Sequence, residues 1–479
     1  MRYDEPLELL IGGEFRPGSE GASEPVIDPA TDEVLAHVPH ASTADLDAAL
    51  EASRRGFEVW RATPALERQK VMERAARLLE ERTERIARNL TLEMGKPVGE
   101  ARLELGFAID VLRWYGEEGK RAYGRTVPAR APGMRQEVRK EPVGPALAFV
   151  AWNFPAVNVM RKVAGALGAG CSLVIKPSEE TPATAVAIAR ALQEAGLPEG
   201  VLNVVFGVPA EVSSHLIASP IPKKISFTGS VEVGKHLQRL AADTLKRCTM
   251  ELGGHAPVMV FADTDVEKVA KMTAAGKFRN GGQVCVSPTR FLVEEAAYDR
   301  FTQAFAEAAK GVQVGHGLED GTVMGPLIGR RRIEVMEGFV EDATGAGATL
   351  LAGGERIGNQ GAFFAPTVLG DVPRGARVMN EEPFGPVAPV ARMASLDDML
   401  EEANRLPFGL AAYAFTSDRK TAGALREGVE AGMLALNSLL VSTPETPFGG
   451  INDSGYGSEG GIEGLEAFQR TRFLTDTDL

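Results

Sequence analysis

The stretch LVIKPSEETPATAVAIARALQEAGLPEGVLNVVF, residues 173–206, decides the fold class. It begins with a short apolar run at 173–176, continues through a helix-like segment at about 182–195, and ends in a second apolar run at 202–206. Short apolar runs separated by a helical segment are typical of parallel strands joined by a crossover helix. The stretch therefore predicts one strand-helix-strand unit.

The same alternation continues on both sides of this unit. Further strand-like runs lie at 146–151, 224–228 and 257–261, and further helix-like segments at about 209–218 and 231–244. This pattern predicts an α/β fold built on a parallel doubly wound sheet, in which ligands bind beyond the carboxyl ends of the strands. Upstream, apolar residues spread among Arg and Glu from 65 to 93 predict an amphipathic helix pair that supports the core.

Composition excludes several classes of protein. A chain of 479 residues that is 44% hydrophobic is too long for one core, and we expect two or three domains. A formal net charge of −13 argues against a nucleic-acid partner. The most apolar stretch, 143–160, is interrupted by Trp152, Asn153 and Pro155, so we expect no membrane segment and a cytoplasmic protein.

The cysteines and histidines give no sign of a disulfide framework or a metal site. Cys171, Cys248 and Cys285 are widely spaced, without a Cys-x-x-Cys pair. The six histidines do not form a metal-ligand pattern. We therefore predict no bound metal.

Cys285 nevertheless stands in an unusual setting. The segment Asn280–Arg290 reads NGGQVCVSPTR, with two glycines just before the cysteine. A flexible turn of this kind can present an accessible thiolate and bring backbone N–H groups close to a developing oxyanion. Most free cysteines are small buried hydrophobes, so the interpretation of Cys285 as a nucleophile needs support from the rest of the chain.

Four further motifs supply that support. They are AWNFP at 151–155, FTGS at 227–230, ELGG at 251–254 and EEPFGP at 381–386. With the cysteine turn, they closely resemble the NAD(P)-dependent aldehyde dehydrogenase superfamily, and most closely its succinate semialdehyde and α-ketoglutaric semialdehyde dehydrogenases. The resemblance runs from about Ile11 to about Arg472.

The resemblance implies an aldehyde dehydrogenase-like architecture. It consists of two doubly wound parallel-sheet domains and a small β oligomerisation domain. The expected ranges are 1–122 and 143–252 for the NAD-binding domain, 253–440 for the catalytic domain, and 123–142 and 462–479 for the oligomerisation segments. Such a small sheet would join subunits, so we expect a homodimer or a homotetramer.

The resemblance also assigns three catalytic roles. Cys285 attacks the aldehyde, and the Asn153 side-chain amide with the backbone N–H of Cys285 stabilises the oxyanion. Glu251 is the general base that activates water against the thioester. Relatives that pass the acyl group to coenzyme A or phosphate generally lack this base, so we expect hydrolysis to a free acid.

The cofactor residues are expected at three places. The sequence lacks Gly-x-Gly-x-x-Gly at the first strand, and a turn with Gly229, Ser230 and Gly234 takes its place at the pyrophosphate. A carboxylate at the adenosine ribose repels a 2′-phosphate, which favours NAD, with NADP as the alternative. By resemblance, the adenosine and nicotinamide ends would be held by Lys176, Ser178 and Glu179, and by Trp152, Glu382 and Phe384, respectively.

Three residues indicate the substrate class. By resemblance to the semialdehyde dehydrogenases, Arg161, Arg290 and Ser442 would hold a carboxylate distal to the aldehyde. We therefore expect an ω-oxo acid of four or five carbons, either succinate semialdehyde or 2-oxoglutarate semialdehyde. The alternatives are a broad-range aldehyde dehydrogenase and a cofactor-binding structural protein without activity.

Overall fold

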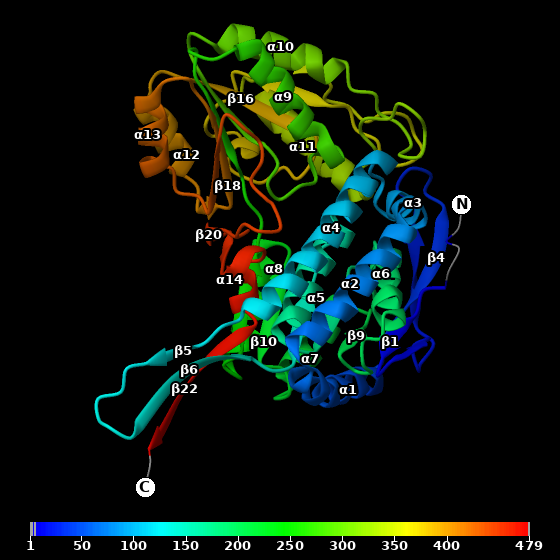
Figure 1. Ribbon diagram of the computed structural model, residues 1–479. Coiled ribbons are helices and arrows are strands. Elements are labelled where there is room, and N and C mark those ends of the chain that lie inside the picture. The colour runs from blue at the N-terminus through cyan, green and yellow to red at the C-terminus, as the bar shows by residue number, and fades with distance from the viewer. Residues whose placement is uncertain (1–2, 4–5, 478–479) are drawn as a thin grey trace.

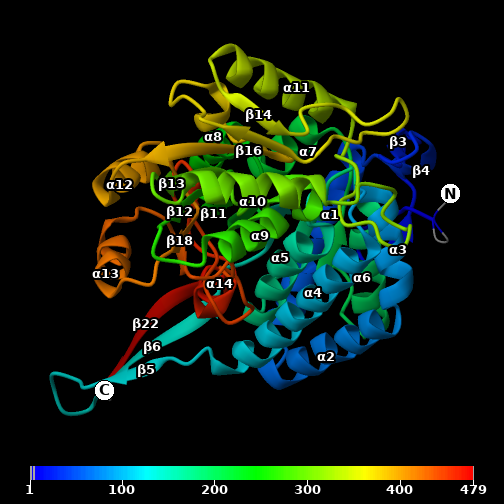
Figure 2. The same cartoon turned by 90° about the horizontal axis from the view of Figure 1, so that it is seen from above.

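The computed structural model describes residue 3 and residues 6–477; residues 1–2, 4–5 and 478–479, at the ends of the predicted first and last segments, lie outside this description. Two large sheets and the helices that cover them make up the body of the molecule. A long narrow sheet projects from this body (Figure 1). Viewed from above, this narrow sheet again extends away from the body (Figure 2).

The first sheet has the strand order β2-β1-β9-β8-β7-β10-β11-β21. From β9 to β11 neighbouring strands run parallel, whereas β1 and β21 join the edges antiparallel. The strands are β1 (Leu9–Ile11), β2 (Glu14–Arg16), β7 (Ala146–Phe149), β8 (Leu173–Lys176), β9 (Leu202–Val204), β10 (Lys224–Thr228), β11 (Arg247–Glu251) and β21 (Gly455–Tyr456). Because β7 lies between β8 and β10, the strand order reverses at β7, and a crevice for a ligand is expected there.

The helices that follow these strands confirm the predicted alternation. The segments predicted near 182–195, 209–218 and 231–244 form α6, α7 and α8, and the predicted pair within 65–93 forms α2 and α3. The bounds are α1 (Thr43–Ala62), α2 (Ala65–Glu81), α3 (Thr83–Met94), α4 (Val98–Glu118), η1 (Gly119–Arg121), α5 (Pro155–Ala169), α6 (Pro182–Glu194), α7 (Pro209–Ala218) and α8 (Val231–Ala242). Several begin with proline, which fits the first turn of a helix because its missing N–H would have no partner there.

The second sheet has the order β14-β15-β16-β13-β12-β18-β19 and is parallel except for β14 at its edge. Its strands are β12 (Pro257–Val260), β13 (Arg290–Glu294), β14 (Thr349–Ala352), β15 (Thr367–Gly370), β16 (Val387–Met393), β18 (Ala411–Phe415) and β19 (Met433–Leu436). The short β17 (Phe408–Gly409) and β20 (Ile451–Asn452) pair beside it.

Helices cover both faces of the second sheet. The bounds are α9 (Val266–Phe278), η2 (Arg279–Gly282), α10 (Tyr298–Lys310), α11 (Arg330–Gly345), η3 (Arg377–Met379), α12 (Leu396–Asn404) and α13 (Arg419–Gly428). Figure 2 shows α9 and α10 on one side of β16 and α11 on the other. Successive strand residues follow this arrangement, since Phe291 packs into the core under α9 and α10 while Leu292 packs into the core under α11 and α12.

The projecting sheet consists of β5 (Arg125–Val127), β6 (Met134–Pro142) and β22 (Gln469–Thr477). β22 pairs antiparallel with β6 along its whole length, after the short helix α14 (Gly461–Glu466). A small sheet from these two flanking segments was predicted, and its presence is confirmed; its role in joining subunits stays a prediction. A separate hairpin of β3 (Ser23–Ile27) and β4 (Val34–Pro39) completes the strands.

A membrane-spanning helix and a group of metal-binding side chains are both absent from the described residues. Among them, no helix is both long enough and apolar enough to cross a bilayer. Within the same residues, His, Cys, Asp and Glu side chains form no group of three or more that would hold a metal ion.

Candidate active site

Cys285 lies in the loop between η2 and β13, directly after a left-handed turn. Asn280, Gly281 and Gly282 have φ values of 51°, 62° and 71°. A Cβ at Gly282 would overlap the carbonyl of Gly385, so only glycine fits this turn. The turn holds Cys285 half-buried in the middle of the molecule.

Two cavities meet at Cys285. One, of about 280 Å³, lies at the carboxyl ends of β7, β10 and β11, where the first sheet reverses its strand order. The other, of about 320 Å³, lies between α4, α5 and the loop after β19. The first is lined by Trp152, Asn153, Gly229, Ser230, Glu251, Arg332, Glu382 and Phe384, and the second by Phe107, Phe154, Arg161, Arg279, Leu440, Ser442 and Phe448. We call these the cofactor-side cavity and the substrate-side cavity.

Burial and the nearby charges favour the protonated form of the Cys285 thiol. Burial raises the pKa of Cys285 to about 12, with a further increase from the negative charge of Glu251. Arg161 acts in the opposite direction and lowers this pKa. At neutral pH the thiolate fraction is therefore small, and the thiol has to lose its proton during the reaction.

Asn153 and Cys285 both line the cofactor-side cavity, and the role of Asn153 as an oxyanion donor stays a prediction. Its side chain is buried, with Nδ2 donating to the Gln283 carbonyl at 3.2 Å and Oδ1 accepting from Asn158 at 3.2 Å. Its carbonyl accepts from Lys96 and from Asn280, which ties it to the cysteine turn. The amide thus has a fixed orientation at the cavity that Cys285 also lines.

Glu251 ends β11 and reaches the same cavity. It is buried, and its Oε1 has no hydrogen-bond partner among the described residues. Burial raises the pKa of Glu251 well above its usual range, and the nearby Glu459 raises it further. A buried carboxyl group with a free oxygen and high proton affinity is suited to take a proton from water.

Two residues beside Glu251 were missed by the sequence reasoning. Lys162 Nζ and Glu459 Oε1 are 2.6 Å apart, and both side chains are buried. Lys162 lowers the pKa of Glu251, so this ion pair influences where protons reside in the site. The sequence sign for Lys162 was a lysine within a mostly apolar stretch, directly after Arg161 in the Val-Met-Arg-Lys run.

The predicted adenosine end lies where β8 ends. The Lys176 ammonium pairs with Glu179 at 2.6 Å, and Glu179 also accepts from the backbone N–H of Gly207 at 3.0 Å. The hydroxyl of Ser178 accepts from the Glu180 N–H at 3.3 Å. The carboxylate of Glu179 is therefore fixed from two sides.

The predicted pyrophosphate turn follows β10. Ser230 caps α8, with its hydroxyl accepting from the Val233 N–H, and this helix N-terminus opens at the cofactor-side cavity. Gly234 packs so close to Leu252 that a Cβ would overlap that side chain. The turn offers backbone donors at a helix N-terminus, as an anionic group requires.

The predicted nicotinamide end lies in the loop before β16. Glu382 is half-buried at the wall of the cofactor-side cavity, with Oε1 accepting from the Gly254 N–H at 3.3 Å, and burial raises its pKa to about 7. The Phe384 ring meets the Trp152 ring edge-on, with centroids 5.5 Å apart. Phe384 has φ 43°, a conformation that costs a non-glycine residue about 1 kcal/mol or more.

Arg161 and Ser442 come together in the substrate-side cavity. Arg161 Nη2 donates to the Ser442 hydroxyl at 2.6 Å, and the guanidinium lies 3.8 Å from the centroid of the Phe448 ring. The side chain is 6% exposed, so its charge is largely shielded from solvent. The two residues, 281 positions apart in sequence, thus form one polar group in the wall of this cavity.

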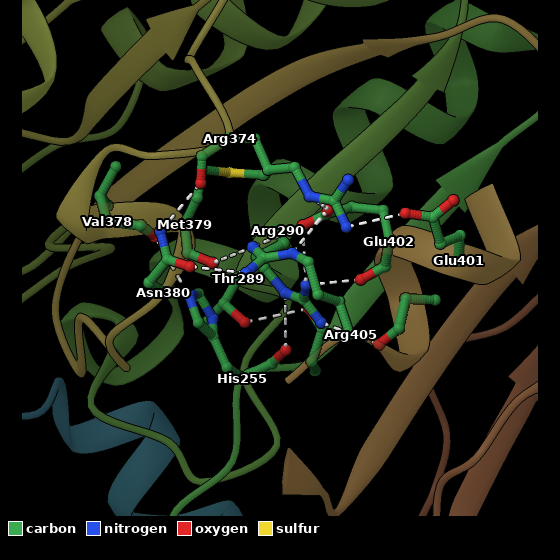
Figure 3. A network of polar contacts seen from close by, with 12 residues as sticks. His255, Thr289, Arg290, Arg374, Val378, Met379, Asn380, Glu401, Glu402 and Arg405 are labelled. Carbon is green, nitrogen blue, oxygen red and sulfur yellow. Dashed lines mark hydrogen bonds and ion pairs between the residues drawn. The ribbon is translucent and has the colours of Figure 1, made fainter. Parts of the chain in front are cut away.

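Arg290 is a correction to the predicted substrate site. Its side chain does not line the cavity but points into the second sheet's core beside α12 (Figure 3). Nη1 contacts the Glu402 carboxylate at 3.1 Å, and the guanidinium also donates to the carbonyls of His255, Glu402 and Ala403. The carbonyls at the end of α12 attract a cation, and they occupy the donors that the substrate was expected to use.

Arg279 is the arginine that the sequence reasoning missed. It begins η2, six residues before Cys285, and lines the substrate-side cavity, as Arg161 does. Its guanidinium lies 5.6 Å from the centroid of the Phe154 ring and has no hydrogen-bond acceptor within the described part of the chain. The side chain is exposed, so its donors remain available to a ligand.

Two carboxylates in the same cavity are already engaged. Glu104 pairs with Lys96 and accepts from the Ala156 N–H at 2.8 Å. Glu100 accepts from the Asn280 N–H at 3.1 Å, and burial raises its pKa. The cavity therefore keeps a positive character from its two arginines.

Comparison with known proteins agrees with this geometry. The profile of the aldehyde dehydrogenase family matches residues 15–474. The chain is 50% identical to putative 4-(hydroxymethyl)benzenesulfonate dehydrogenase TsaD2 of Comamonas testosteroni, over 98% of this chain and 97% of that protein. It is 39% identical to succinate-semialdehyde dehydrogenase [NADP(+)] GabD of Escherichia coli (strain K12), with the same two coverages.

The fold is also found in solved structures. The crystal structure of succinate-semialdehyde dehydrogenase from Burkholderia pseudomallei superposes with a TM-score of 0.97 at 40% identity, covering 99% of this chain and 100% of that one. The predicted α/β architecture is therefore confirmed. Family profile, relatives, fold and the cysteine between two cavities together lead to one conclusion: the chain belongs to the aldehyde dehydrogenase family and is an oxidoreductase that acts on aldehydes.

Proposed function

We propose that this enzyme oxidises a small aldehyde that carries an anionic group at its other end, with a four- or five-carbon ω-oxo acid as the first candidate. Succinate semialdehyde and 2-oxoglutarate semialdehyde both belong to this class. The observation that carries the proposal is the position of Arg161: a shielded guanidinium, bonded to Ser442, in the cavity that opens at Cys285. Arg279 adds a second cation at the same cavity.

The residues of the chain account for the aldehyde chemistry. The Cys285 thiol passes its proton by way of Glu251 to solvent as its sulfur adds to the aldehyde carbon, and the Asn153 amide stabilises the resulting oxyanion. NAD, when bound, supplies the acceptor for the hydride that leaves this carbon, and a thioester remains on Cys285. Glu251 takes a proton from the water that attacks the thioester, which releases a free acid and restores the thiol.

We propose that the cofactor-side cavity receives the nicotinamide and pyrophosphate part of a dinucleotide, and that this dinucleotide is NAD in preference to NADP. The fit rests on the backbone donors at the N-terminus of α8 and on the glycine at 229, where a Cβ would overlap the Phe227 ring. Glu179 is held by Lys176 and the Gly207 N–H, so moving it aside for a 2′-phosphate breaks both contacts. Relatives differ in this choice, since GabD is named for NADP and a solved relative is named an NAD-dependent aldehyde dehydrogenase. We expect a lower KM for NAD than for NADP in the wild type. The difference between the two KM values should become smaller in Glu179→Gln.

We further propose that the enzyme forms a homodimer or a homotetramer through the projecting sheet. β6 and β22 extend well away from the body (Figure 1), and Phe473 on β22 is 58% exposed. An extended sheet with open edges pairs readily with another chain. Sedimentation of the purified protein would show a single species of two or four chains, and a monomer would contradict this.

An aromatic sulfonate is a second candidate substrate, favoured by two observations. Relatives at 50% identity are named for 4-(hydroxymethyl)benzenesulfonate. The substrate-side cavity is lined by the aromatic rings of Phe107, Phe154 and Phe448. A flat ring with a sulfonate would contact these rings and pair with the arginines.

The test compares each anion with an uncharged partner of the same shape. NADH formation would be measured with succinate semialdehyde against butanal, and with 4-formylbenzenesulfonate against benzaldehyde. Because a buried cation is otherwise left unpaired, we expect kcat/KM for the true substrate to exceed that of its uncharged partner by about 100-fold. The kcat/KM for 2-oxoglutarate semialdehyde, compared with that for succinate semialdehyde, would then rank the two ω-oxo acids.

Three other outcomes have distinct meanings. Equal rates within both pairs would indicate a broad-range aldehyde dehydrogenase. A preference confined to the benzene pair would replace the ω-oxo acid by the arylsulfonate. NAD binding without turnover of any aldehyde would revive the alternative of a cofactor-binding protein without activity.

A further inference from the structure

Three consecutive arginines, Arg330 to Arg332, open helix α11. Cations are disfavoured at a helix N-terminus, because they meet the positive end of the helix dipole. The first two have surface partners, Arg330 with Asp32 at 2.6 Å and Arg331 with Glu180 at 2.5 Å. Only the third turns inward, which calls for a separate explanation.

Arg332 reaches the wall of the cofactor-side cavity. Its Nη2 donates to the carbonyls of Pro383 and Phe384, the latter at 3.1 Å. Its Nε is buried without a hydrogen-bond partner among the described residues. Arg332 thus connects α11 to the two residues that follow Glu382 in the chain.

The loop that Arg332 contacts depends on such support. Phe384 adopts a left-handed conformation, which a bulky residue rarely does without outside constraint. Within the described residues, the Glu382 carboxylate accepts one hydrogen bond, from the Gly254 N–H at 3.3 Å. One turn further along α11, Met336 packs so tightly on Gly385 that a Cβ there would overlap its sulfur. Helix α11 therefore contacts three successive residues of the loop, Pro383, Phe384 and Gly385.

Charge balance alone does not explain Arg332. Lys277 on α9 is fully buried and also contributes positive charge to Glu382. Removing Arg332 would leave Glu382 with this second cation, but it would leave two carbonyls of the loop without their donor. The contribution of Arg332 is therefore the anchoring of the loop.

We propose that Arg332 is a positioning residue for the nicotinamide half of the cofactor. By holding the carbonyls of Pro383 and Phe384 on α11, it fixes the Glu382 carboxylate and the Phe384 ring at the wall of the cavity. The adenosine end, with Lys176 and Glu179, does not depend on it. This inference rests on the proposed NAD site, and the experiments below distinguish the two.

The first experiment measures binding without turnover. Titration calorimetry with NADH and with AMP, which occupies only the adenosine end, would be carried out on wild type, Arg332→Met, Arg332→Lys and the matched control Arg330→Met. We expect Arg332→Met to weaken NADH about tenfold and to leave AMP unchanged, because only the nicotinamide end loses its support. Arg332→Lys should recover part of this loss, and Arg330→Met should match wild type for both ligands.

The results that overturn the inference are clear. An equal loss of NADH and AMP binding in Arg332→Met would indicate a general structural role, and unchanged NADH binding would remove any role. Wild-type protein that binds neither ligand would instead overturn the NAD site itself.

A second experiment needs no cofactor. Trp152 contacts Phe384, whereas Trp60 and Trp114 lie elsewhere, and these are the three tryptophans of the chain. Fluorine NMR of 5-fluorotryptophan protein, assigned with Trp152→Phe, should show the Trp152 resonance shifted in Arg332→Met and restored towards wild type in Arg332→Lys. An unchanged Trp152 resonance, or equal changes at all three tryptophans, would overturn the inference.

Discussion

Arg161 and Arg290 are two shielded arginines near the catalytic motifs, and they have opposite surroundings. Arg161 lies on α5 with a serine hydroxyl and two aromatic rings around it, at a cavity that reaches Cys285. Arg290 lies on β13 and is bonded to a carboxylate and three backbone carbonyls. The protein leaves charge available at one arginine and neutralises it at the other. Acceptors supplied by the fold, and not distance along the chain from a motif, distinguish a binding arginine from a structural one.

The largest expected effect concerns the stability of Arg290→Met. Glu402 would keep its contacts with Arg405 and Arg374, but the carbonyls of His255, Glu402 and Ala403 would lose their donor in the core. We expect the free energy of unfolding to fall by about 3 kcal/mol, measured by urea denaturation. The folded fraction should keep the wild-type preference for anionic aldehydes. A normal stability with a lost preference would return Arg290 to the substrate site.

A smaller effect is expected for Arg279→Gln. The guanidinium is exposed and already contacts the Phe154 ring, so its loss removes attraction for the anion at a site that is open to solvent. We expect kcat/KM for the preferred anionic aldehyde to fall about tenfold, with the uncharged partner and the stability unchanged. Steady-state NADH formation would check this. Equal losses with charged and uncharged aldehydes would mean that Arg279 shapes the cavity without contacting the anion.

The smallest effect concerns the thiol. Because the pKa of Cys285 is raised to about 12, the thiolate fraction is small at neutral pH and increases with pH. Alkylation of Cys285 by iodoacetamide should accelerate about tenfold per pH unit between about pH 7 and 9. Arg161 lowers this pKa, so Arg161→Met should slow alkylation a few-fold, whereas Arg290→Met should not change it. Mass spectrometry of the Cys285 peptide gives the rates, and a plateau below about pH 8 would contradict the raised pKa.

The sequence predicted the elements of the fold more closely than the directions of individual side chains. The strands at 173–176 and 224–228 and the helix at 209–218 have the expected bounds, because period and turn residues are local signals. The antiparallel edge strand β14 was not expected, since edge pairing depends on contacts that are distant in sequence.

The wrong assignment of Arg290 to the substrate site and the omission of Arg279 have the same physical reason. Arg290 begins a strand whose alternate residues enter different cores; it shares the face of Leu292, and that face meets α12. Arg279 directly follows α9 as its C-cap, where the helix dipole already accounts for a cation, so its position in the sequence is no sign of a ligand site. Both outcomes depend on which elements pack together, which a single sequence does not encode locally.

The most direct test of the account is the selectivity of Arg161→Met beside Arg290→Met. The quantity to measure is the ratio of kcat/KM for the preferred anionic aldehyde to that for its uncharged partner, in wild type and in both variants. The account predicts that Arg161→Met lowers this ratio by about 100-fold, since a shielded cation loses its pairing with the anion, while Arg290→Met leaves the ratio as in wild type. An unchanged ratio in Arg161→Met, or a collapse in Arg290→Met, would contradict it.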